Sequence, residues 1–289
     1  MDKQTIYLRT IKEAYPSLDI HSARLHTSDG QFNDILYIND DLLFRFPRYE
    51  EDISDFLREI KVLQRLQGHA SLPVPNPIYV SAETRLRGNV FMGYKMLAGR
   101  PLFRETLNSI KDKSTLESFA QQLADFLYGL HHLSPAELGL DLPPPDLLAE
   151  SKSFFSDTEK HLFPLMRPDA RDSVTRHFED YFNNADSHGY ELSLIHGDFG
   201  GSNILFDQSQ ITGIIDFSFA RLGDPAQDIA AVSTYGDSFF AQISRYYPGI
   251  ESLLKRARFY RGTFALYEAL HGFRNHDQEA FASGMEQYV

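Results

Sequence analysis

The sequence contains no cysteine in its 289 residues. Disulfide bonds and thiolate metal sites are therefore excluded, and this composition fits a cytoplasmic protein. Long apolar runs are also missing, because no stretch approaches the roughly 18 to 20 apolar residues that a membrane span needs. The chain opens Met1-Asp2-Lys3-Gln4-Thr5, without the apolar core of a signal peptide. We therefore expect a cytoplasmic protein with no membrane partner.

Positive charge is scarce. Lys and Arg number 28 against 40 Asp and Glu, which gives a net charge of -12. This balance argues against a nucleic-acid partner, whose binding needs clustered basic residues. A negative protein attracts cationic ligands, although solubility alone gives the same composition. Hydrophobic residues make up 42% of the chain, so we expect a globular protein long enough for two lobes.

The stretch from residue 194 to residue 217 carries the most informative pattern. An apolar run leads to a His-Gly-Asp turn that ends at Asp198, and a Gly-Gly loop follows, with Asn203 at the head of a second apolar run. A β-branched strand then ends at Asp216. Loops beside short strands hold the backbone rigidly and leave side chains accessible. Ordinary turns between strands of an α/β domain can each hold an Asp, but they do not produce this ordered set.

This segment resembles the catalytic region of the aminoglycoside phosphotransferases, which share the fold of the protein kinases. Protein kinases carry H-R-D-x-x-x-x-N followed by D-F-G. Here Asn203 stands five residues after Asp198, and Asp216 is followed by Phe217-Ser218. The resemblance implies that Asp198 orients the attacking hydroxyl group and accepts its proton. It also implies that Asn203 and Asp216 hold Mg²⁺ against the phosphates of ATP or GTP.

Two further features favour a small-molecule kinase over a protein kinase. Ser218 stands where protein kinases have glycine, and no A-P-E element follows. A Gly-Asp-Pro-x-x-Asp segment, which recurs in small-molecule kinases, ends at Asp228. The resemblance implies that Asp228 accepts backbone N–H groups of the catalytic loop, so that Asp228 and His196 brace this loop and take no part in the chemistry.

An upstream strand carries the candidate phosphate clamp. The segment Phe44-Arg45-Phe46-Pro47 resembles the F-K-F-P segment of the 2''-type aminoglycoside phosphotransferases, whose lysine contacts the α- and β-phosphates. The resemblance assigns this contact to Arg45 and the pairing with it to Glu59. An exposed strand arginine and a solvated helix glutamate would give the same pattern. An arginine fork binds phosphate oxygens in a bidentate way, but it is not equivalent to lysine.

The remaining nucleotide contacts are expected in a turn and a hinge. A turn containing Ser28 and Gly30 would cover the phosphates, although an ordinary hairpin turn looks the same. The strand predicted over residues 89–97 would run into the hinge, where the Lys95 carbonyl and the Leu97 N–H would bond the purine edge. Tyr94 would lie beside the pocket, where a bulky aromatic ring could obstruct adenine and favour guanine. A plain buried strand is the alternative.

Hydrophobic periodicity predicts both strands and helices, which indicates an α+β protein, and the resemblance implies the bilobal protein-kinase-like fold. Residues 1–97 would form a β-rich nucleotide-binding lobe, and residues 98–289 a mainly helical catalytic and substrate-binding lobe. The expected strands of the first lobe cover residues 20–25, 32–38, 42–46 and 89–97. The expected helices cover residues 4–15, 53–66, 116–133, 250–259 and 261–273, with further helices within 148–188. His131 and His132 point to different faces of their helix, so they cannot chelate one metal ion together.

The resulting hypothesis is a monomeric, Mg²⁺-dependent phosphotransferase that moves the γ-phosphate of ATP or GTP to a hydroxyl group of a small molecule. An aminoglycoside, a cationic antibiotic, is the first candidate acceptor. Enzymes of that kind collect carboxylates in the second lobe to bind ammonium groups. Residues 229–236 contain none, and the candidates are Asp237 and Glu268, with Asp277 as a third. A macrolide, a sugar or an amino alcohol therefore remains an open alternative.

Two other classes of protein also stay open. A nucleotide-binding pseudokinase would act as an interaction protein, and Arg45 in place of lysine is the one feature that favours it. A metal-dependent hydrolase could use Asp198, Asp216 and His196. That alternative leaves Arg45 and Glu59 without a function.

Overall fold

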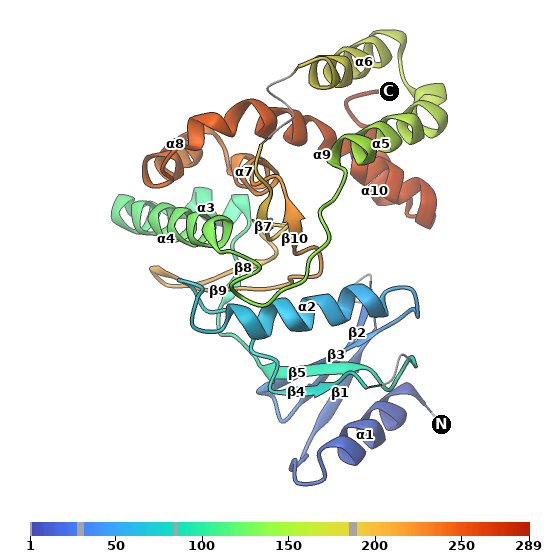
Figure 1. Cartoon of the computed structure of the whole chain (residues 1–289), viewed down its shortest axis with the longest axis vertical. Helices are drawn as coiled ribbons and strands as arrows, with labels where there is room; N and C mark the ends of the chain where they lie inside the picture. Colours follow the sequence, from blue (N-terminus) through green and yellow to red (C-terminus); the bar gives the residue numbers. More distant parts are fainter. Residues whose placement is uncertain (1, 28–31, 84–85, 185–189) are drawn as a thin grey trace.

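The computed structural model describes residues 2–27, 32–83, 86–184 and 190–289. Figure 1 shows a sheet-rich N-terminal half and a mainly helical C-terminal half, as the α+β prediction requires. The turn that holds Ser28 and Gly30 lies outside the described residues, so its predicted role in covering phosphates stays a prediction. Among the described residues, no helix is both long and apolar enough to cross a membrane.

The N-terminal half is built on a five-stranded antiparallel sheet in the order β1-β2-β3-β5-β4. The strands are β1 (Ala23–His26), β2 (Asn33–Ile38), β3 (Leu42–Pro47), β4 (Tyr79–Ser81) and β5 (Phe91–Lys95). Side chains alternate between the two faces of a strand, so Phe44 and Phe46 of β3 share one face and Arg45 takes the other. The predicted strands are present, with ends shifted by at most three residues.

One helix covers each face of this sheet (Figure 1). Helix α1 (Lys3–Ala14) packs on the Phe44 and Phe46 face, where the Tyr7 ring stacks on Phe46 with 3.9 Å between centroids. Helix α2 (Ile53–Leu66) covers the opposite face with a buried apolar stripe that includes Phe56 and Ile60. Arg45 therefore lies between the sheet and α2, on the side that faces the second half.

The C-terminal half holds two small sheets and the remaining helices. The strands are β6 (Arg100–Pro101), β7 (Ser193–Ile195), β8 (Ile204–Asp207), β9 (Gln210–Ile214) and β10 (Arg221–Gly223). Their pairing gives one sheet in the order β6-β8-β9 and a β10-β7 pair. The predicted lobe boundary at residue 97 falls in the link between β5 and β6.

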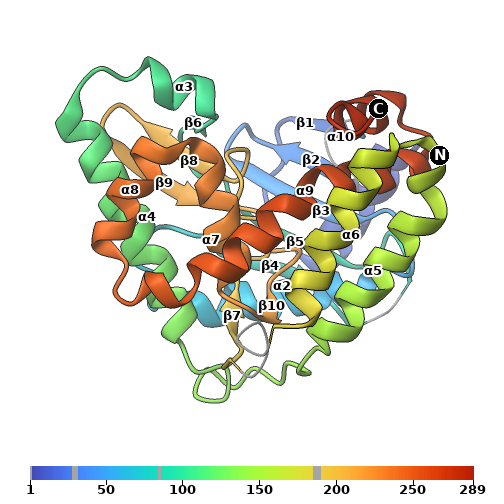
Figure 2. The ribbon, with the colours of Figure 1, turned by 90° about the horizontal axis from the view of Figure 1, so that it is seen from above.

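The helices of this half gather in two groups, which Figure 2 shows on opposite sides of the molecule. One group consists of α3 (Arg104–Ser109), α4 (Lys113–His132) and α8 (Asp237–Tyr246). The other consists of α5 (Leu147–His161), α6 (Pro168–Phe182), α9 (Leu254–Asn275) and α10 (Gln278–Met285). Helix α7 (Ala226–Val232) lies between them, and short 3₁₀ turns cover Phe163–Leu165, Ser233–Tyr235 and Ile250–Ser252. The helices predicted over 250–259 and 261–273 are one helix, α9, because no proline interrupts it.

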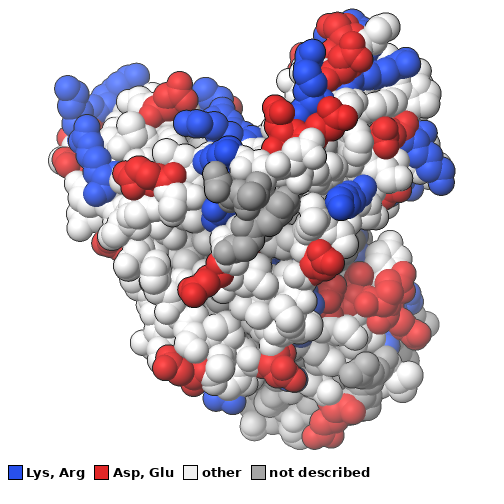
Figure 3. Space-filling model, turned by 45° about the horizontal axis from the view of Figure 1, so that its top comes forward, with Lys and Arg blue, Asp and Glu red and all other residues white. Residues whose placement is uncertain are grey.

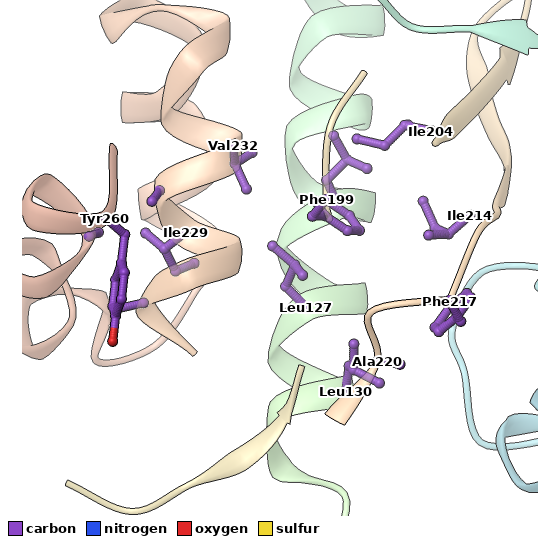
Figure 4. Close-up of a cluster of buried hydrophobic side chains, with 14 of the residues drawn as sticks. Leu127, Leu130, Phe199, Ile204, Ile214, Phe217, Ala220, Ile229, Val232 and Tyr260 are labelled. Atoms are coloured by element: carbon purple, nitrogen blue, oxygen red, sulfur yellow. The ribbon is translucent and has the colours of Figure 1, made fainter. Parts of the chain in front are cut away.

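The core of this half joins α4 to the segment that carries the candidate catalytic residues (Figure 4). Leu127 and Leu130 project from α4 toward Phe199 and Phe217, which immediately follow Asp198 and Asp216. The Phe126 and Phe199 rings stack with 5.8 Å between centroids. Side chains in a close-packed core have little room to shift, so this packing fixes where the two short loops begin.

Candidate active site

The loop after β7 depends on one glycine. Gly197 has a φ of 82°, in the left-handed region that favours glycine. A Cβ atom at this position would lie 2.5 Å from the backbone oxygen of Phe219. A side chain is therefore excluded on two grounds, and the arginine that protein kinases carry here would not fit this loop. The tight turn places Asp198 immediately after Gly197, at the start of the loop.

Asn203 holds Asp198 in place. Its Nδ2 donates hydrogen bonds to the Asp198 backbone oxygen and to Asp198 Oδ2, both at 2.9 Å. The Asn203 side chain is buried, so this geometry is fixed by the core around it. Burial raises the pKa of the Asp198 carboxyl group above its ordinary value, and the neighbouring His196 ring only partly opposes this shift.

Asp228 accepts hydrogen bonds from the backbone that leads into the loop. The N–H groups of His196 and Gly197 donate to its two carboxylate oxygens at 2.8 and 2.9 Å. His131 of α4 contacts the same carboxylate at 3.0 Å, and Tyr247 contacts the other side of that imidazole at 2.8 Å. Burial raises the pKa of Asp228, but its hydrogen bond and charge interaction with His131, together with His196, lower it to a net value below the ordinary one. The contacts are those expected of a structural brace.

The His196 ring links the two candidate catalytic loops. It is completely buried. Its Nδ1 accepts the N–H of Asp198 at 3.2 Å, so Nε2 carries the proton and donates to the Ile215 carbonyl at 3.0 Å. Both ring nitrogens are used in holding backbone, which leaves no free nitrogen for a hydrolytic role.

Asp216 follows β9 in a strained backbone conformation. Its φ of 61° lies in the left-handed region, which is uncommon for a residue with a side chain and clusters at functional sites. The Ile215 N–H donates to the Asn203 carbonyl at 2.9 Å, so the backbones beside Asn203 and Asp216 are tied together. Burial raises the pKa of Asp216, but Arg45 and Ser218 lower it more, so the net pKa lies below the ordinary value.

Arg45 and Glu59 form a buried ion pair between β3 and α2. The Arg45 Nη1 and Glu59 Oε1 atoms are 2.5 Å apart, and the two side chains are 8% and 1% exposed. The alternatives of an exposed strand arginine and a solvated helix glutamate are therefore wrong. Arg45 Nη2 also reaches Asp216 Oδ1 at 3.3 Å, which joins the N-terminal half to the C-terminal half. Burial lowers the pKa of Arg45, but Glu59 and Asp216 raise it more, and the guanidinium stays charged.

The hinge candidates lie at the end of β5. Leu43 pairs with Tyr94 and Arg45 pairs with Met92, so Tyr94 shares the face of the sheet that carries Arg45. Tyr94 is buried, and this burial raises its pKa to about 12. Lys95 is exposed, and Leu97 packs so closely on Gly213 of β9 that a Cβ there would lie 2.6 Å from Leu97 Cδ1. The predicted hinge thus touches the C-terminal half directly.

The three carboxylates proposed for an acceptor are placed differently, and Asp277 caps the start of α10. Asp237 lines a cavity of about 260 Å³ between α3 and α8, together with Arg104 and Tyr235. The Tyr235 hydroxyl donates to the Leu102 carbonyl at 2.5 Å and adjoins Gly201 of the catalytic loop. Glu268 lies exposed on α9 and does not line this cavity. On the face drawn in Figure 3, acidic and basic side chains are interspersed around a hollow beside the projecting helices.

Sequence reasoning missed a second buried ion pair that anchors the same region. Arg256 of α9 donates to Asp224 through Nε at 2.7 Å and through Nη2 at 3.1 Å. Asp224 also caps the start of α7 by accepting the Ala226 N–H at 3.0 Å. The Gly-Asp-Pro-x-x-Asp segment drew attention to this stretch, but no signal in the sequence pointed to Arg256. The Ser218 hydroxyl, which contacts Arg45 and Asp216, was also missed.

The donor set fits a magnesium ion bound together with phosphates. Among the described residues, no group of three or more His, Asp or Glu side chains could hold a metal ion alone. Asn203 and Asp216 offer two oxygen ligands on adjoining backbone. Mg²⁺ typically takes one or two protein oxygens and completes its shell with phosphate oxygens and water.

The chain is similar in sequence and in fold to known phosphotransferases. The model of the family described as "Phosphotransferase enzyme family" matches residues 26–260. Viomycin phosphotransferase of Streptomyces vinaceus is 26% identical over 273 residues, which cover 91% of this chain and 92% of that protein. The GDP and kanamycin complex of APH(2")-IIia has a TM-score of 0.85 at 26% identity and covers 97% of this chain and 96% of its own.

A wild-type aminoglycoside 2'-phosphotransferase-IIIa in complex with GDP has a TM-score of 0.86 at 25% identity, with 99% of this chain and 97% of that chain covered. The similarity to macrolide 2'-phosphotransferase type I, with a TM-score of 0.73 at 19% identity, concerns the fold alone. These similarities confirm the predicted bilobal, protein-kinase-like fold.

Proposed function

The chain belongs to the phosphotransferase enzyme family, and we propose that it moves the γ-phosphate of ATP or GTP to a hydroxyl group of an aminoglycoside antibiotic. One observation carries this proposal. The Glu59–Arg45–Asp216 contacts join the two halves at the same place where Asn203 fixes Asp198. A cation for the phosphates, two oxygen ligands and a carboxylate for the acceptor thus lie on rigid, adjoining backbone.

In this mechanism each residue acts on a stated atom. Asp198 would accept the proton of the acceptor's hydroxyl group while the oxygen of that hydroxyl group forms the new bond to the γ-phosphorus. The bond from that phosphorus to the bridging oxygen breaks, and the nucleoside diphosphate leaves. Arg45, kept charged by Glu59, would bind the α- and β-phosphate oxygens. Mg²⁺, held by Asn203 and Asp216, would supply further neutralisation of phosphate charge.

The choice of donor depends on Tyr94. Its buried ring lies on the face of the sheet that carries Arg45, at the end of the strand that leads into the hinge. A ring in this position would narrow the space beside the purine. GTP is therefore the favoured donor, with the purine edge bonded by the Lys95 carbonyl and the Leu97 N–H.

A second acceptor, viomycin, is favoured by one specific observation. The relative whose identity spans 91% of this chain is a viomycin phosphotransferase. Of the candidate carboxylates, Asp237 lines the cavity between α3 and α8 and Glu268 does not. An acceptor that binds in this cavity through fewer ammonium groups than an aminoglycoside suits that arrangement.

The pseudokinase and hydrolase alternatives lose support from the same contacts. Arg45 was the one feature that favoured a pseudokinase, yet it makes the ion pair with Glu59 that the clamp requires. His196 uses both ring nitrogens to hold backbone, so it is not available to activate water.

The test is nucleotide consumption by purified protein with Mg²⁺, using ATP and GTP in parallel. The acceptors are kanamycin, viomycin, a macrolide and a small amino alcohol, with a no-acceptor control. We expect turnover that depends on an aminoglycoside or on viomycin and is faster with GTP. Nucleotide binding without turnover on any acceptor would contradict the proposed reaction, and turnover with the amino alcohol alone would contradict the proposed acceptor.

A further inference from the structure

Two residues in this chain depart from the protein-kinase pattern, and the structure brings them together. Arg45 replaces the strand lysine, and Ser218 replaces the glycine that follows Asp-Phe. They are 173 positions apart in sequence. Arg45 Nη2 nevertheless donates to Ser218 Oγ at 3.0 Å.

The contact depends on the shape of the guanidinium group. Nη1 of Arg45 is taken by Glu59, so Nη2 points past the ion pair toward the C-terminal half. Lysine has a single nitrogen and no second donor in a fixed position. An arginine at this position therefore brings an extra N–H fork that needs an acceptor of its own.

Ser218 supplies this acceptor and connects Arg45 to Asp216. Its hydroxyl accepts from Arg45 Nη2 and donates to Asp216 Oδ1, and it lies 3.4 Å from Glu59 Oε2. Arg45 Nη2 also contacts Asp216 Oδ1 directly at 3.3 Å. Ser218 thus adds a second, hydroxyl-mediated link between the Arg45 guanidinium and the Asp216 carboxylate.

The charges in this cluster make the position of Asp216 critical. One buried cation, Arg45, faces the carboxylates of Glu59 and Asp216, so the three groups carry a net negative charge. The Asp216 side chain is 45% exposed, against 8% and 1% for its partners. Its exposed side can therefore serve an incoming cation, provided that the other side is held at Oδ1.

We propose that Ser218 is a positioning residue paired with Arg45, and that its hydroxyl orients Asp216 toward the metal–nucleotide complex. The pair replaces lysine and glycine as a unit, so each member makes the other necessary. This inference rests on the proposed function only for the identity of the bound species, a divalent cation with a nucleotide.

The test measures binding without any acceptor. Mn²⁺ affinity is followed by electron paramagnetic resonance in the presence of a non-hydrolysable GTP analogue, for wild type, Ser218→Gly, Arg45→Lys and the double variant. Ser218→Ala is a second probe in case the glycine variant folds poorly. Ser218→Thr keeps a hydroxyl and tests rescue. Ser244→Ala, which removes a hydroxyl bonded to the Phe240 carbonyl on α8, is the matched control.

We expect Ser218→Gly and Ser218→Ala to weaken Mn²⁺ affinity about ten-fold, the loss typical of one hydrogen bond to a charged group. Ser218→Thr and Ser244→Ala should stay close to wild type. The double variant should bind at least ten-fold better than the product of the two single losses predicts. Unchanged affinity in Ser218→Ala, or additive losses in the double variant, would overturn the pairing. Wild-type protein that binds no metal–nucleotide complex at all would overturn the proposed function as well.

Discussion

The Asp216 carboxylate lies where the two halves of the molecule meet, in contact with Arg45. Arg45 with Ser218 keeps the pKa of Asp216 low against the effect of burial, as the proposed metal-binding role requires. The left-handed backbone at Asp216 is strained, and the hydrogen bond from the Ile215 N–H to the Asn203 carbonyl helps to hold it. The strain and the low pKa both suit the cation-binding role that we propose for this carboxylate.

Replacing this carboxylate should separate metal binding from folding. Asp216→Asn keeps the size of the side chain and removes its charge, so we expect Mg²⁺-dependent nucleotide affinity to fall by roughly 10- to 100-fold. Titration calorimetry with GTP, with and without Mg²⁺, measures the change. Affinity that stays at the wild-type level in the presence of Mg²⁺ would remove Asp216 from the metal site.

Gly197 offers a sharp test of the catalytic turn. Gly197→Ala adds a methyl group 2.5 Å from the Phe219 backbone oxygen at a φ of 82°. We expect a loss of about 1 to 3 kcal/mol in the free energy of unfolding and a large loss of transfer activity. Urea denaturation and turnover measure the two effects.

The matched control is Gly129 in the last turn of α4, where an added Cβ meets nothing within 4 Å. Gly129→Ala should be neutral or should stabilise the protein by up to about 1 kcal/mol, because alanine favours helix. Equal effects of the two substitutions would contradict the argument for the turn.

At the scale of elements, the ladder β1–β2–β3 is joined to α1 by a buried carboxylate. Asp34 of β2 accepts hydrogen bonds from Lys3 and Tyr7 of α1 at 2.9 and 2.7 Å, and from Arg48 at 2.9 Å. Arg48 also donates to the Thr27 carbonyl. Asp34 therefore ties α1, the sheet and the residue that precedes the predicted phosphate-covering turn into one unit.

This cluster predicts a specific dependence of stability on pH. Burial raises the pKa of Asp34, but Lys3, Tyr7 and Arg48 lower it more, to below the ordinary 3.8. A carboxyl group whose pKa is lower in the folded state stabilises the fold above its unfolded pKa, and this contribution is lost as the pH falls through the folded value. Asp34→Asn should therefore cost about 2 kcal/mol of unfolding free energy at pH 7, and less below about pH 4.

Urea denaturation at a series of pH values compares Asp34→Asn with the wild type. Asp141→Asn serves as the control, because Asp141 is exposed. A difference between wild type and Asp34→Asn that stays constant from pH 7 to pH 3 would contradict the assigned pKa shift.

The sequence predicted well those elements whose signal is local. Helix α2 begins and ends where its apolar period places it, and the order Asp198, Asn203, Asp216 marks the candidate site because all three lie within a short stretch. The contacts that hold this site are long-range. Arg256 meets Asp224, and His131 meets Asp228 from 97 positions away, with nothing in the spacing of residues to reveal either pair.

Alternation along a strand was informative only for apolar residues. It placed Phe44 and Phe46 on one face but could not show whether Arg45 faced water or α2. Packing of α2 on the sheet decides this, because the helix covers the part of the face opposite α1 on which Arg45 lies. Ser218 was noted as a departure from glycine, yet its hydrogen bonds depend on how the two halves meet, which is a property of the complete fold.

At the scale of the whole molecule, the two halves meet through a line of contacts from α2 to α4. Glu59 holds Arg45, Arg45 reaches Asp216, and the adjoining loops are packed on α4 and held by Asp228 (Figure 4). We propose that this line places a nucleotide from one half against an acceptor on the other, with Asp198 between them.

The most direct measurement of this claim is ³¹P NMR of a reaction of wild type and Asp198→Asn with GTP, Mg²⁺ and the acceptor that supports turnover. We expect wild type to convert the γ-phosphate signal into that of a phosphomonoester on the acceptor. Asp198→Asn should keep nucleotide affinity within a few-fold and lose at least about 100-fold in rate, the usual contribution of a general base. A phosphomonoester formed by Asp198→Asn at most of the wild-type rate, or inorganic phosphate as the only product of the wild type, would contradict it.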